Sequence, residues 1–154
     1  MFRKLFIILC VSFANVAWGA DEEYCLAEAI YFEGRNQSVT GQEAIGLVIM
    51  NRVKEIKFPS TPCKVTRQAK YYNYQPVLHQ CHFSFYCDGK PEHIHNHISW
   101  KIAKQIASKL LRNEVFDFTE GALYYHALYI KKPYWANSMK TVLIVDEHIF
   151  YGED

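Results

Sequence analysis

Two stretches of sequence decide the fold of this chain: EEYCLAEAIYFEG at residues 22–34 and TGQEAIGLVIMNRVK at residues 40–54. In each stretch, apolar side chains recur at three- and four-residue spacing, which is the period of an α-helix. Gly34 is a stop signal for the first helix, and Thr40 followed by Glu43 predicts a capping box that opens the second. We expect the two helices to pack together through their apolar stripes.

The rest of the sequence predicts shorter elements around this pair. We expect a short helix over residues 63–69, after the Pro59–Pro62 break, and a helix over residues 96–112 that Asn96 caps. We also expect three strands, over residues 81–87, 122–129 and 141–145. The strand over 81–87 rests on strict alternation of side chains, and the turn pair Asp88-Gly89 ends it. Because no repeat or linker marks a second domain, we expect one α+β domain, mainly helical, with a small antiparallel β-sheet.

Composition and charge exclude several classes of protein. The chain has 154 residues, of which 50% are hydrophobic and 21% charged, so it can bury a core and does not resemble a disordered segment. It carries 17 Lys+Arg and 16 Asp+Glu, a formal charge of +1. A sequence-independent nucleic-acid binder needs a strongly basic surface to displace counterions from phosphates. We therefore expect no nucleic-acid partner.

The N-terminus has the pattern of a secretory signal peptide. Arg3 and Lys4 form a positive region, and the apolar stretch from Leu5 to Ala17 is short for a membrane span. Cleavage after Gly19 or Ala20 removes residues 1–20 and leaves residues 21–154 as the functional domain. The alternative is an uncleaved membrane anchor. We expect an exported protein, periplasmic or extracellular, with no stable membrane insertion after cleavage.

Cysteine usage agrees with export. Cys10 lies in the expected signal peptide, and Cys25, Cys63, Cys81 and Cys87 remain, which predicts two disulfides with three possible connectivities. If residues 81–87 are extended, Cys81 and Cys87 lie about 20 Å apart and cannot pair with each other. Each is then expected to bond to Cys25 or Cys63. A four-thiolate zinc site is the weaker alternative, since the chain has no CxxC knuckle.

Several short motifs, in order along the chain, carry a family resemblance. They are IYFEGR at 30–35, Gly41-Gln42, Asn51-Arg52-Val53, FSF at 83–85 with Asp88-Gly89, GALYY at 121–125, Trp135 and HIFY at 148–151. In these motifs the chain resembles the SleB/CwlJ-type cell-wall hydrolases. The resemblance implies a peptidoglycan hydrolase with a fold like lysozyme and the lytic transglycosylases, and it places the family's catalytic glutamate at Glu33.

The sequence also departs from the family pattern. Gly34 stands where the family usually has alanine, and Asn36-Gln37 stands where a glycine and a second glutamate are common. Asp146 occupies a position that is often glycine, two residues before His148. These departures remove one carboxylate and change the turn before His148.

The chemistry gives an independent reason to select Glu33. Cleavage of a glycosidic bond needs a proton donor, and a glutamate desolvated by aromatic neighbours has a raised pKa and can donate near neutral pH. The candidate neighbours are Tyr31, Phe32, Phe83 and Phe85. The competing interpretation is an ordinary solvated glutamate near a helix C-terminus.

A second catalytic carboxylate is not evident. Glu28 is expected to point away from Glu33 on the helix, Glu43 to serve the capping box, and Asp88 to be a turn residue. Glycosidases that use two carboxyl groups are thereby disfavoured. A lytic transglycosylase needs only one, because its glutamate first protonates the leaving oxygen and then deprotonates the substrate's own C6 hydroxyl.

A glycan groove needs flat rings and neutral hydrogen-bonding groups. The candidate substrate-binding residues are Arg35, Gln42, Asn51, Ser84, Tyr124, Tyr125 and Trp135. Arg35, with Arg52, could hold a peptide or lactyl carboxylate, although a structural ion pair is an equal alternative for both. Core packing is the alternative for each aromatic residue.

Two other functions compete with glycan cleavage. One is a zinc N-acetylmuramoyl-L-alanine amidase that uses His126, His148 or the HxHxH string His93, His95 and His97. That string is expected to be a solvated loop, and His126 and His148 to orient neighbouring groups. The other is a wall-binding module without activity. We expect a monomer that acts on peptidoglycan and uses no metal or cofactor.

Overall fold

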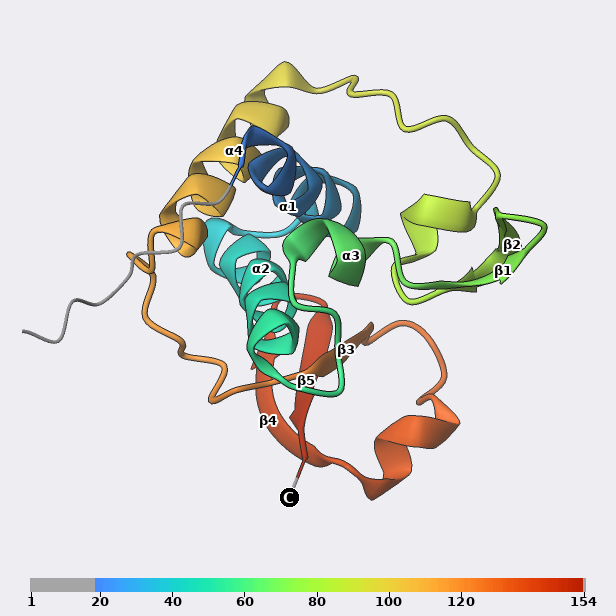
Figure 1. The fold of residues 1–154 in the computed structure, drawn as a ribbon. Helices are drawn as coiled ribbons and strands as arrows, with labels where there is room; N and C mark the ends of the chain where they lie inside the picture. Colours follow the sequence, from blue (N-terminus) through green and yellow to red (C-terminus); the bar gives the residue numbers. More distant parts are fainter. Residues whose placement is uncertain (1–18, 154) are drawn as a thin grey trace, which may run out of the picture.

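A computed structural model describes residues 19–153 of the chain (Figure 1). Its helices are α1 (Ala20–Gly34), α2 (Val39–Lys54), α3 (Pro62–Thr66), η1 (Ser84–Cys87), α4 (His97–Leu111) and η2 (Tyr134–Ser138). Its strands are β1 (Ala69–Tyr72), β2 (Gln75–Cys81), β3 (Tyr124–Ala127), β4 (Lys140–Val145) and β5 (His148–Gly152). The predicted signal peptide lies outside the described residues, apart from Gly19 and Ala20, and stays a prediction.

The helical core forms where the sequence predicts it. Helix α1 packs against both α2 and α4 (Figure 1), and fully buried side chains such as Leu26 and Ile30 fill the space between them. Gly46 allows the close approach of α2, because a Cβ there would lie 2.4 Å from Leu110 Cδ1 of α4. The predicted helices over 22–34, 40–54 and 96–112 are confirmed.

One of the two predicted helix caps is confirmed and the other is wrong. Asn96 caps α4, since its side chain accepts hydrogen bonds from the backbone N–H groups of Ile98 and Ser99. The capping box at Thr40 and Glu43 is wrong. Ser38 caps α2 instead and accepts from the Gly41 N–H at 3.1 Å, so the helix begins earlier than its apolar stripe indicates.

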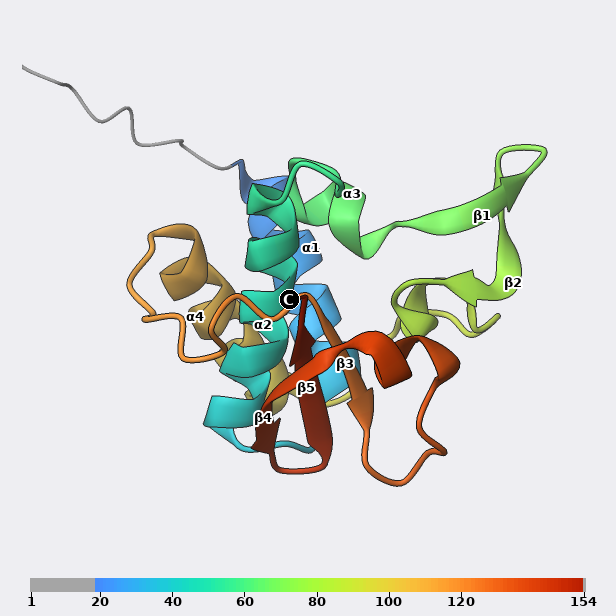
Figure 2. The same ribbon diagram turned by 90° about the horizontal axis from the view of Figure 1, so that it is seen from below.

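The strands form two small antiparallel sheets. β1 and β2 make a hairpin, and β3, β5 and β4 make a three-stranded sheet in that order, with β5 in the centre (Figure 2). The predicted strands over 122–129 and 141–145 contain β3 and most of β4. The sequence analysis did not predict the hairpin or β5.

The predicted strand over 81–87, and the disulfide pairing drawn from it, are wrong. The chain turns here through the 3-10 helix η1, and Phe83 and Phe85 are both buried. The alternation of buried and exposed side chains in this segment is therefore produced by a turn and not by a strand. The turn brings the Cα atoms of Cys81 and Cys87 within 6.1 Å, and these two residues form a disulfide. The other disulfide joins Cys25 of α1 to Cys63 of α3 across 38 residues.

A short polar contact joins the sheet to the helices. Asp146, in the turn between β4 and β5, accepts hydrogen bonds at 2.9 Å and 2.7 Å from the backbone N–H and the hydroxyl of Ser38. Gly41 leaves room for this carboxylate, since a Cβ there would lie 2.3 Å from it. Asp146 has φ +48°, a left-handed conformation that glycine adopts most easily. Here aspartate takes that conformation and fixes the turn to the start of α2.

Among residues 19–153, no helix is long and apolar enough to cross a membrane.

Candidate active site

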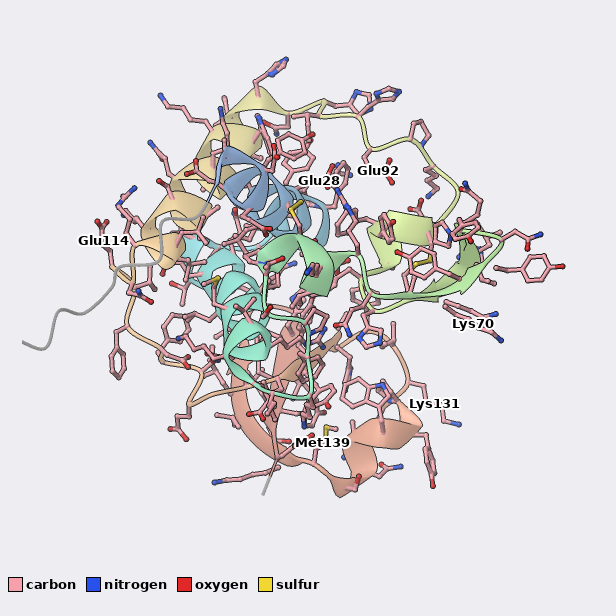
Figure 3. The ribbon with its side chains drawn as sticks, viewed as in Figure 1. Glu28, Lys70, Glu92, Glu114, Lys131 and Met139 are labelled. Carbon is pink, nitrogen blue, oxygen red and sulfur yellow. A yellow bond between two sulfur atoms is a disulfide. The ribbon has the colours of Figure 1, made fainter. Side chains whose placement is uncertain are left out.

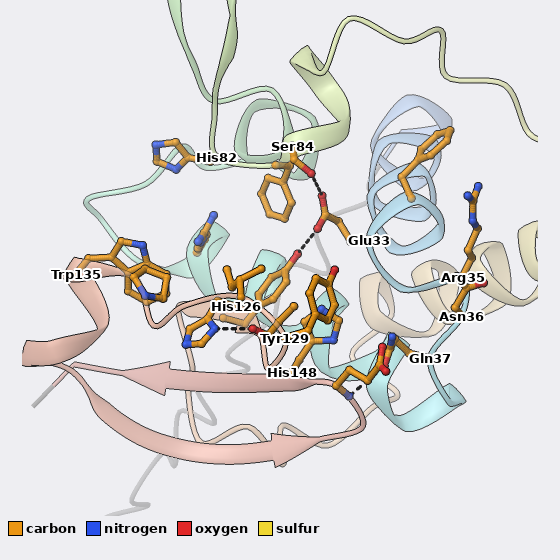
Figure 4. A pocket seen from close by; sticks show the side chains of 18 residues that line it. Glu33, Arg35, Asn36, Gln37, His82, Ser84, His126, Tyr129, Trp135 and His148 are labelled. Atoms are coloured by element: carbon orange, nitrogen blue, oxygen red, sulfur yellow. Dashed lines mark hydrogen bonds between the residues drawn. The ribbon is translucent and has the colours of Figure 1, made fainter.

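A cleft of about 670 Å³ lies between the C-terminal end of α1, the segment before and within η1, and the three-stranded sheet (Figure 4). Its lining brings together five of the eight residues predicted to be catalytic or substrate-binding. They are Glu33, Arg35, Ser84, Tyr125 and Trp135. These residues come from both halves of the chain, so the fold assembles the cleft from α1, η1, β3 and η2.

Glu33 lies on the last turn of α1 and points into the cleft between two hydroxyl donors (Figure 4). The Tyr125 hydroxyl donates to Glu33 Oε2 at 3.1 Å, and the Ser84 hydroxyl reaches Oε1 at a longer 3.4 Å. Tyr125 comes from β3, and Ser84 is the first residue of η1. The carboxyl group is therefore held from both sides, while it still lines the cleft.

Burial raises the pKa of the Glu33 carboxyl above its ordinary value. The hydrogen bonds from Tyr125 and Ser84 act in the opposite direction, because they favour the carboxylate, but they do not outweigh the burial. Burial also raises the pKa of Tyr125 well above its ordinary value, so this phenol stays neutral and serves as a donor. The raised pKa is the property that a general acid needs near neutral pH.

Aromatic packing creates this environment. Phe32 and Phe83 line the cleft, and the Phe32 ring stacks on Phe85 with centroids 5.3 Å apart. Tyr31, the fourth expected neighbour, has another role. It is fully buried, and its hydroxyl accepts the backbone N–H groups of His95 and Asn96 at 3.2 Å and 3.0 Å, which fixes the start of α4.

The sheet side of the cleft is a packed group of rings. His148 lies edge-on to Tyr125 with ring centroids 5.4 Å apart, and burial lowers its pKa, which keeps the imidazole neutral. His126 bonds the Tyr151 hydroxyl through Nε2 at 2.9 Å, and Trp135 packs against His126 at 6.0 Å. His126 is therefore hydrogen-bonded to Tyr151, whereas His148 contacts Tyr125 by ring packing.

Arg52 is a buried cation in the wall of the cleft. Its Nε donates to the Leu123 carbonyl at 2.7 Å, and its guanidinium lies 5.2 Å from the Phe83 ring centroid and 5.5 Å from that of Tyr124. Within residues 19–153 it has no carboxylate partner, and its buried Nη1 has no hydrogen bond. Arg52 braces the aromatic wall and places positive charge near Glu33.

Three predicted substrate-binding residues do not line the cleft. Gln42 is buried and donates to the Gln37 carbonyl at 3.1 Å. Asn51 is buried and donates to Asp117 at 3.0 Å, which holds the loop before β3. The Tyr124 hydroxyl donates to Glu153 at 3.2 Å, and its ring packs behind the lining residue Trp135 with ring centroids 5.7 Å apart.

Several cleft residues were missed as site candidates. His82 lines the cleft beside Ser84, and Gln37 and Glu147 meet where the Glu147 N–H donates to Gln37 Oε1 at 3.3 Å. Glu147 is a second carboxylate in the lining. Its only sequence signal was its position in the altered turn before His148.

The histidine string occupies the loop before α4, as expected. His93 and His95 are exposed with ring centroids 6.0 Å apart, and His97 is the first residue of α4. Among the described residues, no three His, Cys, Asp or Glu side chains gather closely enough to hold a metal ion.

The family described as Cell Wall Hydrolase matches residues 36–151 of the chain. The chain belongs to this family. This result confirms the resemblance drawn from the sequence motifs. The matched range begins just after Glu33.

Two solved structures resemble this cell wall hydrolase. The catalytic domain of the SleB protein of Bacillus cereus superposes with a TM-score of 0.65 and 26% identity, covering 92% of this chain and 99% of that one. The catalytic domain of the germination-specific lytic transglycosylase SleB of Bacillus anthracis gives 0.64 and 24%, covering 89% and 98%. No curated protein sequence matches the chain. The predicted lysozyme-like α+β fold is confirmed.

Membership in the family makes peptidoglycan the substrate of this cell wall hydrolase. The family and the two disulfides also indicate a location outside the cytoplasm, because disulfides form and persist in oxidising compartments.

Proposed function

We propose that this cell wall hydrolase cleaves the glycan strand between N-acetylmuramic acid and N-acetylglucosamine as a lytic transglycosylase, with Glu33 as its general acid and base. The carrying observation is the Glu33 carboxyl itself: its pKa is raised by burial, and Ser84 and Tyr125 aim it into the cleft. A protonated carboxyl at this position can donate to the glycosidic oxygen of a bound strand.

The reaction proceeds in two steps at one carboxyl group. Glu33 gives its proton to the glycosidic oxygen, the bond from that oxygen to C1 of muramic acid breaks, and positive charge develops at C1. The Glu33 carboxylate then takes the proton of the C6 hydroxyl of the same sugar, and O6 bonds to C1. A 1,6-anhydro ring results, Glu33 is protonated again, and no water is consumed.

Other cleft residues support binding and positioning. The Trp135 ring, 37% exposed, offers a flat apolar face to a sugar ring. Arg35 lies at the rim, where its charge suits the carboxylate of a stem peptide or lactyl group. The Tyr125 and Ser84 hydroxyls stabilise Glu33 as the carboxylate that exists between the two steps.

The first test compares the wild-type protein with Glu33→Gln on purified peptidoglycan. We expect at least about a 100-fold loss of soluble product, the low end of what a positioned proton donor contributes. Mass spectrometry should show 1,6-anhydro ends in the wild-type digest. Glu43→Gln, which changes a glutamate outside the cleft lining, should retain activity.

Other products would contradict the proposal in distinct ways. Reducing muramic acid ends would indicate hydrolysis, and free stem peptides made by a chelator-sensitive reaction would indicate an amidase. Binding to walls without any soluble product would indicate a wall-binding module.

Glu147→Gln tests whether the second carboxylate in the cleft takes part. An inverting hydrolase needs a second carboxylate to activate water, and its loss would then be severe. Since O6 of the substrate replaces water in our proposal, we expect a change in rate below about threefold, with unchanged 1,6-anhydro products. A loss comparable to that of Glu33→Gln would rule out the single-carboxyl mechanism.

A further inference from the structure

The β1–β2 hairpin projects away from the helical body (Figures 1 and 2). Tyr72 is 74% exposed and Tyr74 is 98% exposed. Figure 3 marks the hairpin with Lys70, whose side chain points away from the body. Because both rings are exposed, they contribute little hydrophobic stabilisation to the folded chain.

The backbone conformation at the tip of the hairpin is unfavourable for a tyrosine at position 74. Asn73 and Tyr74 form the two-residue turn and have φ +46° and +62°. Tight hairpin turns with positive φ at both positions strongly favour Asn-Gly, because glycine has no Cβ to clash. A tyrosine there is strained and fully exposed, so neither the fold nor packing explains it.

The base of the hairpin is firmly anchored to the body. Glu28 of α1 forms a salt bridge at 2.6 Å with Arg67, whose guanidinium lies 4.8 Å from the Tyr86 ring centroid. The Tyr71 hydroxyl donates to the Arg67 carbonyl at 2.8 Å and lies 3.2 Å from the Tyr86 hydroxyl. The base of the hairpin is therefore held against the body, which limits the freedom that the hairpin can lose on binding.

Two open hollows lie along the hairpin and share lining residues with the cleft and with each other. The hollow next to the cleft, about 450 Å³, shares His82 with the cleft lining and contains Arg67 and Tyr71. The outer hollow, about 500 Å³, is lined by Tyr71, Asn73 and Tyr74. Strand β2, seven residues long, extends this row by on the order of 20 Å. A row of hollows that starts at a catalytic cleft suits a linear polymer.

We propose that the hairpin tip, with Tyr74 in the lining of the outer hollow and Tyr72 exposed two residues before it, forms a second carbohydrate-binding site, which holds a peptidoglycan glycan strand several sugars away from the linkage being cleaved. The proposal rests on the proposed function for the identity of the polymer. Tyrosine rings stack on the C–H faces of sugars, and their hydroxyls bond sugar hydroxyls and N-acetyl groups.

The charge of the hairpin favours this ligand over a membrane surface. Residues 69–81 contain no Asp or Glu, and Lys70 is the only Lys or Arg among them. Adsorption to anionic lipid typically requires a cluster of four or more basic residues. The aromatic, nearly uncharged tip instead matches an uncharged face of a glycan.

The test uses the double variant Tyr72→Ser/Tyr74→Gly of the protein. Glycine suits the φ of residue 74, so this variant should melt at or above the wild-type temperature and a folding defect is avoided. We expect pelleting with insoluble peptidoglycan to weaken about tenfold, because two stacking rings are lost. Cleavage of insoluble walls should fall similarly, while cleavage of a short soluble muropeptide oligomer should not change. Phe116→Ser, which removes an aromatic ring that is 84% exposed outside the hairpin, is the matched control.

Each remaining outcome has a definite meaning. Wild-type pelleting by the double variant, or equal loss of cleavage on long and short substrates, overturns the proposal. Tyrosine-dependent binding to phosphatidylglycerol vesicles without binding to peptidoglycan overturns it in favour of a membrane. If the wild type binds walls through the tyrosines but makes no glycan products, the proposed function fails and the site stands.

Discussion

The two sides of the cleft hold Glu33 by different means. On the sheet side, Tyr125 is fixed by rings packed on it, with His148 at 5.4 Å and Phe150 at 5.6 Å between centroids. On the loop side, Ser84 lies in a six-residue loop that the Cys81–Cys87 disulfide closes. A packed sheet tolerates the loss of one contact better than a short loop tolerates the loss of its crosslink. The loop side should therefore be the more fragile one.

Among the variants that compare the two sides of the cleft, we expect the largest loss of activity when the Cys81–Cys87 disulfide is removed. Cys81→Ser/Cys87→Ser should release Ser84 and the buried Phe83 and lower kcat/KM by about 30-fold, since misplaced catalytic groups are costly. The expected loss of stability is about 2 kcal/mol for this short loop. The measurements are initial rates on peptidoglycan and urea unfolding.

Cys25→Ser/Cys63→Ser is the matched control for that variant. This disulfide closes a longer loop, so its loss should cost about 4 kcal/mol of stability. At a temperature where the variant stays folded, its kcat/KM should be close to that of the wild type. If instead this variant lost more activity than Cys81→Ser/Cys87→Ser, the contrast between the two sides would be wrong.

Tyr125→Phe tests the sheet side and should lower kcat/KM by about tenfold, as expected for loss of a hydrogen bond to a charged group. In the proposed mechanism Glu33 acts in its protonated form, so activity should fall as the pH rises through its pKa. The Tyr125 hydrogen bond lowers that pKa, and removing it should move the high-pH limb of the pH–rate profile to higher pH.

Tyr124→Phe is a close control, because the neighbouring hydroxyl bonds Glu153 outside the cleft. Its rate and pH profile should match those of the wild type. A high-pH limb that stays fixed or moves downward in Tyr125→Phe would contradict the assignment of that limb to Glu33.

Ser84→Ala should have the smallest effect of the series. At 3.4 Å, its hydrogen bond to Glu33 is long, so we expect a loss of about threefold and a smaller upward shift of the same limb. Ser84→Thr keeps the hydroxyl and should restore most of the rate. A loss larger than that of Tyr125→Phe would show that Ser84 contacts the substrate directly.

The helical half of the fold could be read from the sequence, whereas much of the strand structure could not. The helices have apolar stripes of period 3.6, which burial on one face produces. β5 is buried on nearly all sides and so shows no alternation, although the residues His148 to Tyr151 were noticed as a motif. The hairpin is mostly exposed, and its Asn-Tyr turn lacks the glycine that signals such a turn.

The sequence motifs identified only some of the residues that line the cleft. Glu33 and Tyr125 reach the cleft, but Gln42 and Asn51 belong to equally recognisable motifs and are used to hold loops. A motif marks residues under constraint without separating structural from catalytic constraint. The adjacent residues Tyr124 and Tyr125 differ in the same way, since Tyr125 lines the cleft while the Tyr124 hydroxyl bonds Glu153.

The position of β5 in the sheet has a consequence for when activity can first appear. This strand, His148–Gly152, comes last along the chain yet lies between β3 and β4. A nascent or truncated polypeptide that stops before His148 leaves β3 without its partner, so Tyr125 has no support beside Glu33. We expect such a fragment to be inactive, because the cleft is complete only once β5 has been made and has paired with β3.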